Sequence, residues 1–74
     1  MPRKDNNYVY GFAERLDETI AKRGLSQYEV CKRVGVSDSV IWCYINYHKM
    51  PTCMTLARLS KVLGVSTDYL LGLE

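Results

Sequence analysis

One short pattern, a glycine followed by an apolar residue and a serine, occurs three times in the chain. The copies are Gly24-Leu25-Ser26, Gly35-Val36-Ser37 and Gly64-Val65-Ser66. Glycine adopts the left-handed conformation that often ends a helix, and serine accepts hydrogen bonds from the free amides that begin the next one. Three copies predict a chain divided into short helices, with the apolar residue of each turn directed into the core.

The segments between these turns have the apolar spacing of helices. Apolar residues recur every four positions from Phe12 to Ile20, which predicts an amphipathic helix over residues 11–23. About eight residues between the first two glycines form a second helix, opened by a capping box between Ser26 and Glu29. A short helix followed by a tight turn is typical of a helix-turn-helix unit.

Two further helices are predicted after Pro51. Thr52 can cap a helix whose apolar stripe ends at Gly64, and Ser66 can open a last helical turn over residues 67–71. With the helix expected between the second and third turns, these segments predict an all-α fold, a compact bundle of five short helices.

The segment between the second turn and Pro51 gives conflicting signals. Residues 40–45 are mostly β-branched or aromatic, which suits a buried strand. However, the only other strand-like run nearby is the brief stretch 8–10, and Ser37 stands where a helix cap is expected. These two observations favour a helix over residues 37–46.

The length of 74 residues allows one small domain, which we divide into an N-terminal arm over residues 1–10 and a folded domain over 11–74. The longest apolar run is too short to cross a membrane, and the N-terminus leads into no signal-peptide core. Three cysteines without paired spacing predict reduced thiols in a cytoplasmic protein, and neither a metal site nor a cofactor is expected. They are Cys31, Cys43 and Cys53.

The charged residues are nearly balanced. Ten basic and eight acidic side chains give a net charge of +2, which permits DNA binding without predicting it. An enzyme is not expected, because His48 is the only histidine and no glycine-rich phosphate loop follows a strand. A deep pocket beside His48 would be the observation that favours one.

A family resemblance extends over most of the chain. The matching residues are Phe12-Ala13-Glu14-Arg15-Leu16, Gly24-Leu25-Ser26-Gln27, Val34-Gly35-Val36-Ser37, Ile41, Asn46, Pro51-Thr52, Leu56, Leu59, Leu63-Gly64-Val65-Ser66 and Asp68-Tyr69-Leu70-Leu71-Gly72. With them, segment 11–72 resembles the phage repressor and Cro (Xre-type) helix-turn-helix family. The resemblance implies a lambda-repressor-like bundle that binds operator DNA, usually as a dimer, with helix 37–46 in the major groove.

The chain also departs from the family pattern. Many members carry an arginine at position 20 and a glutamate at position 45, which form a buried ion pair, whereas this chain has Ile20 and Ile45. Two apolar residues can replace such a pair when both charges are lost together. We therefore expect Ile20 and Ile45 to touch in the core. Tyr47 stands where the family commonly has glycine, so the loop after this helix is expected to differ.

Helical geometry divides residues 37–46 into two sides. With Ile41 directed inward, Tyr44 and Ile45 fall on the same side at 100° per residue. The opposite side carries Ser39, Trp42, Cys43 and Asn46. The family's base-reading positions correspond to Asp38, Ser39, Trp42 and Cys43. The predicted base-reading set is therefore Asp38, Ser39, Trp42, Cys43 and Asn46.

This predicted set has unusual chemistry for DNA. Strong guanine recognition is not expected, because the set has no arginine or lysine, and only Asn46 can pair bidentately with adenine. Ser39 can bond a base edge or a phosphate, while Trp42 and Cys43 can lie against thymine methyl groups. Asp38 either accepts a hydrogen bond from cytosine or stabilises the positive end of the helix.

Backbone contacts are predicted on both flanks of this helix. The predicted phosphate-binding residues are Gln27, Ser37, Tyr47, Lys49, Arg3 and Lys4. Gln27 stands where the family holds the DNA backbone with a glutamine, although an ordinary exposed first-turn residue is the alternative. Arg3 and Lys4 form either a basic arm along the duplex or a solvated tail.

Two functions remain open at this point. The first is a transcriptional regulator or repressor that binds double-stranded DNA as a homodimer on a palindromic operator. Its dimer contacts would come from the apolar tail, Tyr69, Leu70, Leu71 and Leu73, unless the first of these close the core. The alternative is a protein–protein interaction module that uses an exposed patch of Trp42, Cys43 and Tyr47. DNA binding is favoured because it alone gives Gln27, Ser37 and Lys49 a joint purpose.

Overall fold

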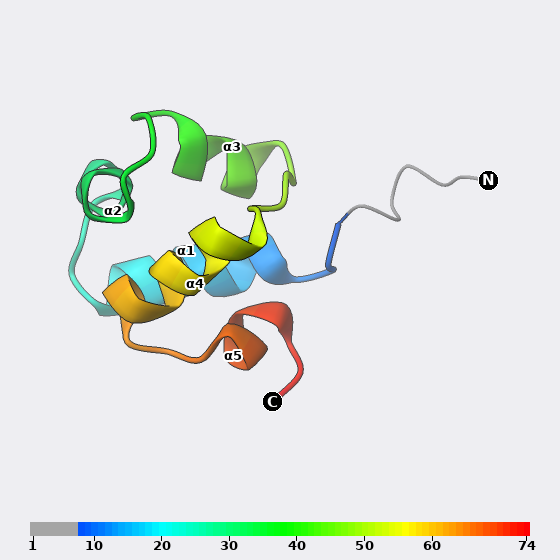
Figure 1. The fold of residues 1–74 in the computed structure, drawn as a ribbon. Helices are drawn as coiled ribbons and strands as arrows, with labels where there is room; N and C mark the ends of the chain where they lie inside the picture. The colour runs from blue at the N-terminus through cyan, green and yellow to red at the C-terminus, as the bar shows by residue number, and fades with distance from the viewer. Residues whose placement is uncertain (1–7) are drawn as a thin grey trace.

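The computed structural model describes residues 8–74, and this part of the chain forms five helices and no strand. The helices are α1 (Phe12–Lys22), α2 (Gln27–Val34), α3 (Val40–Asn46), α4 (Cys53–Leu63) and α5 (Thr67–Leu71). In Figure 1, α3 lies above α1 and α5 lies below it, and α1 contacts both. The predicted all-α bundle of five short helices is confirmed.

The predicted turns end and begin the helices as expected. Gly24, Gly35 and Gly64 all have positive φ angles, of 70°, 89° and 69°. The capping box is present, because the Ser26 hydroxyl accepts from the Glu29 amide and the Glu29 carboxylate accepts from the Ser26 amide. The bond from the Ser26 amide is the main cause that lowers the pKa of Glu29 below its ordinary value of 4.5.

The two caps predicted in the second half of the chain are also confirmed. The Thr52 hydroxyl accepts a hydrogen bond from the amide of Thr55 at 3.3 Å, and the Ser66 hydroxyl accepts from the amide of Tyr69 at 3.0 Å. Each bond satisfies one of the free amides at the start of α4 or α5. α5 has only five residues, so this cap and its packing on α1 and α4 hold it in place.

The start of α3 differs from the prediction. The helix begins at Val40, and Ser37 does not cap it with its side chain. Instead the Ser37 carbonyl accepts from the amide of Val40 at 3.1 Å, which closes a backbone turn before the helix. Ser39 occupies the cap position, and its side chain makes no capping bond. The prediction was wrong because a backbone turn replaces here the side-chain cap that Ser26, Thr52 and Ser66 provide at α2, α4 and α5.

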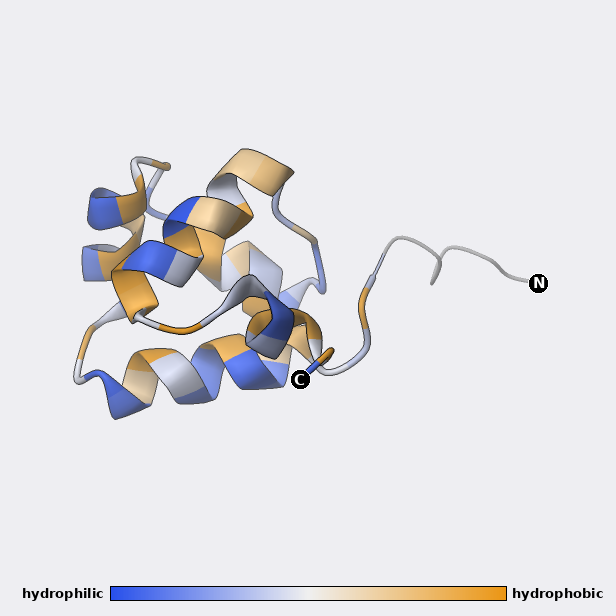
Figure 2. Ribbon diagram, turned by 60° about the horizontal axis from the view of Figure 1, so that its bottom comes forward, coloured by the Kyte–Doolittle hydropathy of each residue, from blue (hydrophilic) through white to orange (hydrophobic). Residues whose placement is uncertain are grey.

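All five helices contribute to one core. Its buried members are Phe12, Leu16, Ile20, Val30, Cys31, Val34, Ile41, Tyr44, Leu59, Leu63 and Leu70. Figure 2 shows the hydrophobic residues of α1 turned toward the other helices and its hydrophilic residues along the outer side. Ile20 belongs to this core, and Ile45 is half-buried against the same cluster. α1 and α3 pack on each other, which agrees with the expected apolar replacement, and direct contact of Ile20 with Ile45 stays a prediction.

The first described residues are tied to the domain rather than separate from it. The Tyr8 hydroxyl accepts from the amide of Ala13 at 2.8 Å, in the first turn of α1. Gly11, at the cap position of this helix, has no side chain for the task. The Arg15 guanidinium donates to the carbonyl of Tyr10 at 3.0 Å and to that of Leu70 at 2.9 Å, which joins this segment, α1 and α5.

The two isoleucines that stand where the resemblance implies a buried ion pair generate a stability prediction. Ile20→Arg alone places an unpaired charge in the core and should lower the free energy of unfolding by about 3 to 5 kcal/mol. Adding Ile45→Glu should recover most of that loss. Chemical denaturation of the single and double variants measures both effects. The matched control is Ile20→Arg with Tyr47→Glu, which adds the same charge at an exposed position and should recover little. Equal recovery by the two glutamates would contradict the account.

Candidate nucleic-acid interface

The two sides of α3 have opposite environments. Ile41 is fully buried and Tyr44 is 8% exposed, so both anchor the helix to the core. Burial of the Tyr44 ring raises the pKa of its hydroxyl. On the other side Trp42 is 45% exposed. The helix geometry expected from the sequence is therefore confirmed, with a surface side opposite Ile41.

All five predicted base-reading residues are exposed or half-buried. Asp38 and Ser39 are exposed in the turn before α3, while Asn46 is exposed and Cys43 half-buried on the helix itself. The carbonyl of Asp38 accepts from the buried thiol of Cys31 at 3.4 Å, which fixes the turn to α2. α2, the turn and α3 together form the helix-turn-helix unit, with α2 and α3 in contact.

Two side-chain contacts on this surface were not foreseen from the sequence. The Asn46 amide nitrogen donates to the carbonyl of Trp42 at 3.0 Å, so it is engaged with the helix's own backbone. The rings of Trp42 and Tyr47 meet edge to face, with centroids 5.2 Å apart and planes at 87°. The bond uses one of the two amide hydrogens of Asn46, so the second hydrogen and the amide oxygen stay free, but it limits the directions in which they can point. The contact of Trp42 with Tyr47 adds an ordered aromatic area to this surface.

Four of the six predicted phosphate-binding residues lie at or near the ends of α2 and α3. Gln27 is the first residue of α2 and is half-buried, whereas Ser37, Tyr47 and Lys49 are exposed. Arg3 and Lys4 lie outside the described residues. The Glu29 carboxylate already caps the start of α2, so the side chain of Gln27, more than the free amides, is available for an anion there.

An exposed aromatic residue on α2 was missed. Tyr28 is 53% exposed and follows Gln27 in the first turn of the helix. The ammonium group of Lys32 lies over the Tyr28 ring, 5.5 Å from its centroid. The spacing of four residues between an aromatic and a lysine on one helix was the available signal. Tyr28 therefore adds a hydroxyl and a nearby cation to the start of α2.

The model of the helix-turn-helix family matches residues 14–70, from the first turn of α1 to α5. The chain belongs to the helix-turn-helix family. The match includes α2, α3 and α4 in full and most of α1 and α5, and so contains the α2–turn–α3 unit whose outer surface is described above.

Two curated relatives from Bacillus subtilis (strain 168) are similar to this domain. One is the HTH-type transcriptional regulator ImmR, 36% identical over 59 residues, which cover 80% of this chain and 46% of the relative. The other is the SPbeta prophage-derived uncharacterized HTH-type transcriptional regulator YonR, 37% identical over 60 residues, which cover 81% of this chain and 56% of the relative. The chain spans about half the length of these relatives.

The apolar tail expected to dimerise this helix-turn-helix domain is only partly at the surface. Leu70 is fully buried in the core, so its assignment to a dimer contact was wrong. The reason is that α5 packs on α1 and α4, which turns Leu70 inward. Tyr69 and Leu71 are half-buried against the core, while Leu73 is 71% exposed.

No helix within residues 8–74 is long and apolar enough to cross a membrane.

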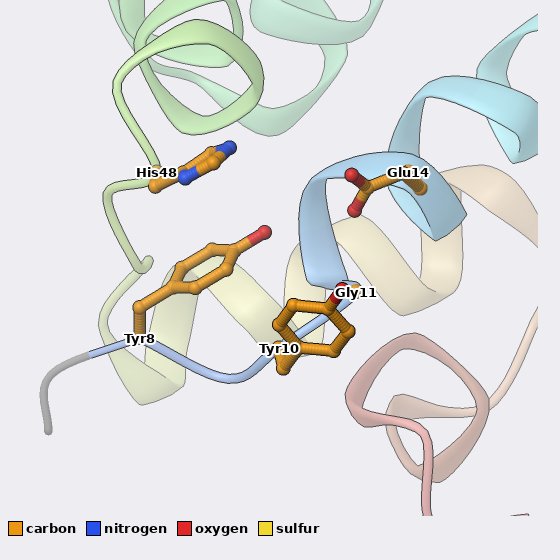
Figure 3. Close-up of a pocket in the computed structure, with 5 residues that line it drawn as sticks. All are labelled: Tyr8, Tyr10, Gly11, Glu14 and His48. Carbon is orange, nitrogen blue, oxygen red and sulfur yellow. The ribbon is translucent and has the colours of Figure 1, made fainter. Parts of the chain in front are cut away.

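A pocket of about 410 Å³ opens beside His48, between the N-terminal segment, the start of α1 and the loop after α3. Its lining residues are Tyr8, Tyr10, Gly11, Glu14 and His48 (Figure 3). The rings of Tyr8 and His48 stack, with centroids 4.6 Å apart and planes at 14°. The Tyr8 hydroxyl is held by the α1 backbone. A pocket at this place was the observation expected to favour an enzyme. Because the Tyr8 ring and hydroxyl and the His48 ring are engaged in contacts that join residues 8–10 to the domain, we interpret the pocket as a seam between them.

The stack of Tyr8 on His48 also explains the conformation of the loop after α3, which was expected to differ from the family pattern. Tyr47, which replaces the family's common glycine, has an ordinary φ of −108°. The left-handed conformation falls instead on His48, with a φ of 55°. This conformation is uncommon for a residue with a side chain, and packing on Tyr8 helps to hold it. The loop that carries Tyr47 and Lys49 is thus fixed by the N-terminal segment.

The contacts of Tyr8 generate a second stability prediction. Tyr8→Phe keeps the ring that stacks on His48 but removes the oxygen that accepts from Ala13. The free energy of unfolding should fall by about 1 kcal/mol, because an amide of α1 loses its cap. Tyr10→Phe is the matched control, since Tyr10 is 93% exposed and should tolerate the change. Equal stability of the two variants in chemical denaturation would show that the hydroxyl does not act as a cap.

Proposed function

We propose that this domain binds double-stranded DNA as part of a transcriptional regulator, with the exposed side of α3 in the major groove. The observation that carries the proposal is the burial of Ile41 and Tyr44, which leaves Ser39, Trp42 and Cys43 on the outer side of an α2–turn–α3 unit. The family match over residues 14–70 and the two relatives described as transcriptional regulators support it.

The backbone contacts follow from the same orientation. Gln27 is the first residue of α2, and Ser37 lies in the turn before α3. Tyr47 and Lys49 follow α3, so the four residues flank the groove-facing surface on two sides. Their side chains would hold phosphates and set the position of α3 in the groove. Arg3 and Lys4 would extend these contacts along the duplex.

A single unit of this size contacts few base pairs, so we propose that two copies bind a palindromic operator with half-sites about one helical turn apart. Leu73, with the exposed parts of Tyr69 and Leu71, would contribute to the contact between copies. Repression is the regulatory outcome that we favour, and the cytoplasmic location stays a prediction. A protein-binding role for Trp42, Cys43 and Tyr47 has no separate observation in its support.

The intrinsic fluorescence of Trp42, the only tryptophan, tests the proposal. Random-sequence duplex DNA added at low salt should change the signal, and the apparent affinity should fall with a log–log salt slope of about −0.9 per phosphate contacted. Lys49→Ala should make this slope shallower by about 0.9, because one phosphate contact is lost.

Lys22→Ala is the matched control for this experiment. Lys22 lies at the end of α1 beside Val65 and Tyr69, away from the proposed DNA surface, so its removal should leave the slope nearly unchanged. A fluorescence signal that no duplex alters at low salt would refute the proposed function.

A further inference from the structure

The proposed function leaves open which feature of DNA this surface recognises. α3 has the sequence Val-Ile-Trp-Cys-Tyr-Ile-Asn, in which Asn46 is the only exposed residue with a hydrogen-bonding side chain besides the indole nitrogen of Trp42. The Asn46 amide nitrogen is already bonded to the carbonyl of Trp42. The polar groups of Asp38 and Ser39 lie before the helix, at one end of the surface. The middle of the surface therefore has little capacity to recognise base edges by hydrogen bonds.

What the middle of the surface does offer is an ordered apolar face. Trp42 and Tyr47 meet edge to face at 5.2 Å, although they are 45% and 62% exposed. We call these two residues the aromatic pair. Cys43, half-buried next to Trp42, adds a soft thiol that behaves as a small apolar group. Edge-to-face packing restricts both rings before any partner arrives, so binding loses less side-chain freedom.

The apolar feature that the major groove presents is the methyl group on carbon 5 of thymine. Adenine, guanine and unmodified cytosine present donors and acceptors there instead. Contact with the aromatic pair would remove apolar surface of both partners from water, which is favourable in proportion to the area buried. An arginine or glutamine at position 42 would favour a purine, whereas an indole gains little from one.

We propose that the aromatic pair, with Cys43, recognises the 5-methyl group of a pyrimidine in the major groove, an inference that rests on the proposed DNA-binding function. Thymine and 5-methylcytosine carry this methyl group at the same position of the ring. The shared chemistry is an apolar methyl contact with the indole of Trp42, which Tyr47 holds in place. Trp42 is then the residue that determines specificity, and Tyr47 is a positioning residue.

The test begins with a duplex selected by the natural protein from a random-sequence pool. That duplex is then synthesised with thymines replaced one at a time by deoxyuridine, which removes only the methyl group. At a contacted position the dissociation constant should rise about fourfold, the effect of leaving one methyl group unburied. A second series replaces each sensitive thymine–adenine pair by cytosine–guanine or by 5-methylcytosine–guanine. The methylated form should bind more tightly than the unmethylated form, and equal binding of the two would overturn the shared recognition and confine the contact to thymine.

Variants assign the effect to the aromatic pair. In Trp42→Ala, deoxyuridine and thymine duplexes should bind equally, because the contact is absent. In Tyr47→Ala the fourfold difference in dissociation constant between the two duplexes should become smaller, because the Trp42 indole loses its edge-to-face contact with Tyr47. Tyr10→Ala is the matched control, because Tyr10 is an exposed aromatic residue on the N-terminal segment and its removal should preserve the difference. If circular dichroism shows that Trp42→Ala lowers the helix content, Trp42→Phe is used in its place. This variant should reduce in part the difference in affinity between thymine and deoxyuridine duplexes.

The outcomes separate the inference from the function on which it rests. Equal binding of thymine and deoxyuridine duplexes at every position, with salt-dependent binding intact, would overturn methyl recognition and leave DNA binding in place. A thymine preference that persists unchanged in Trp42→Ala and Tyr47→Ala would overturn its assignment to these residues. Absence of binding to every duplex at low salt would overturn the proposed function itself.

Discussion

The burial of Ile41 and Tyr44 is the contact on which the rest of this structure depends. α3 has only seven residues, and a helix of that length is not stable alone in water. It exists because these two side chains enter a core built by α1 and α2. The same burial fixes the rotation of the helix and so decides that Trp42 and Asn46 face outward. Folding and the proposed recognition surface therefore have one physical cause.

Much of this fold could be predicted because its signals are local. A glycine with a positive φ and a serine that caps the next helix act within a few residues, and both occur at residues 24–26 and 64–66. The copy at residues 35–37 also has the positive φ, but the predicted cap by the Ser37 side chain was wrong, because a backbone turn precedes α3 instead. Leu70 was misassigned because an apolar residue near a chain end has the same local pattern in a core and in an interface. Only the packing of α5 distinguishes the two.

The exposed side of α3 was predictable from the sequence, but the contacts among its side chains were not. Spacing alone placed the exposed side of α3, whereas the bond from Asn46 to the backbone and the edge-to-face packing of Trp42 on Tyr47 depend on side-chain conformations. The stack of Tyr8 on His48 joins segments 40 positions apart, and no local pattern indicates it. Together these contacts give the exposed side of α3 an ordered aromatic area beside a loop that packs on residues 8–10.

The central claim, that the outer side of α3 is the DNA-facing surface, is tested most directly by NMR. Amide chemical shifts of the isotope-labelled domain would be compared before and after addition of the selected duplex. The account predicts that the largest shifts cluster from Ser37 to Lys49 and at the start of α2, with smaller shifts in α5 where two copies would meet. Shifts centred on α5 or on residues 8–14, with residues 37–49 unchanged, would contradict it.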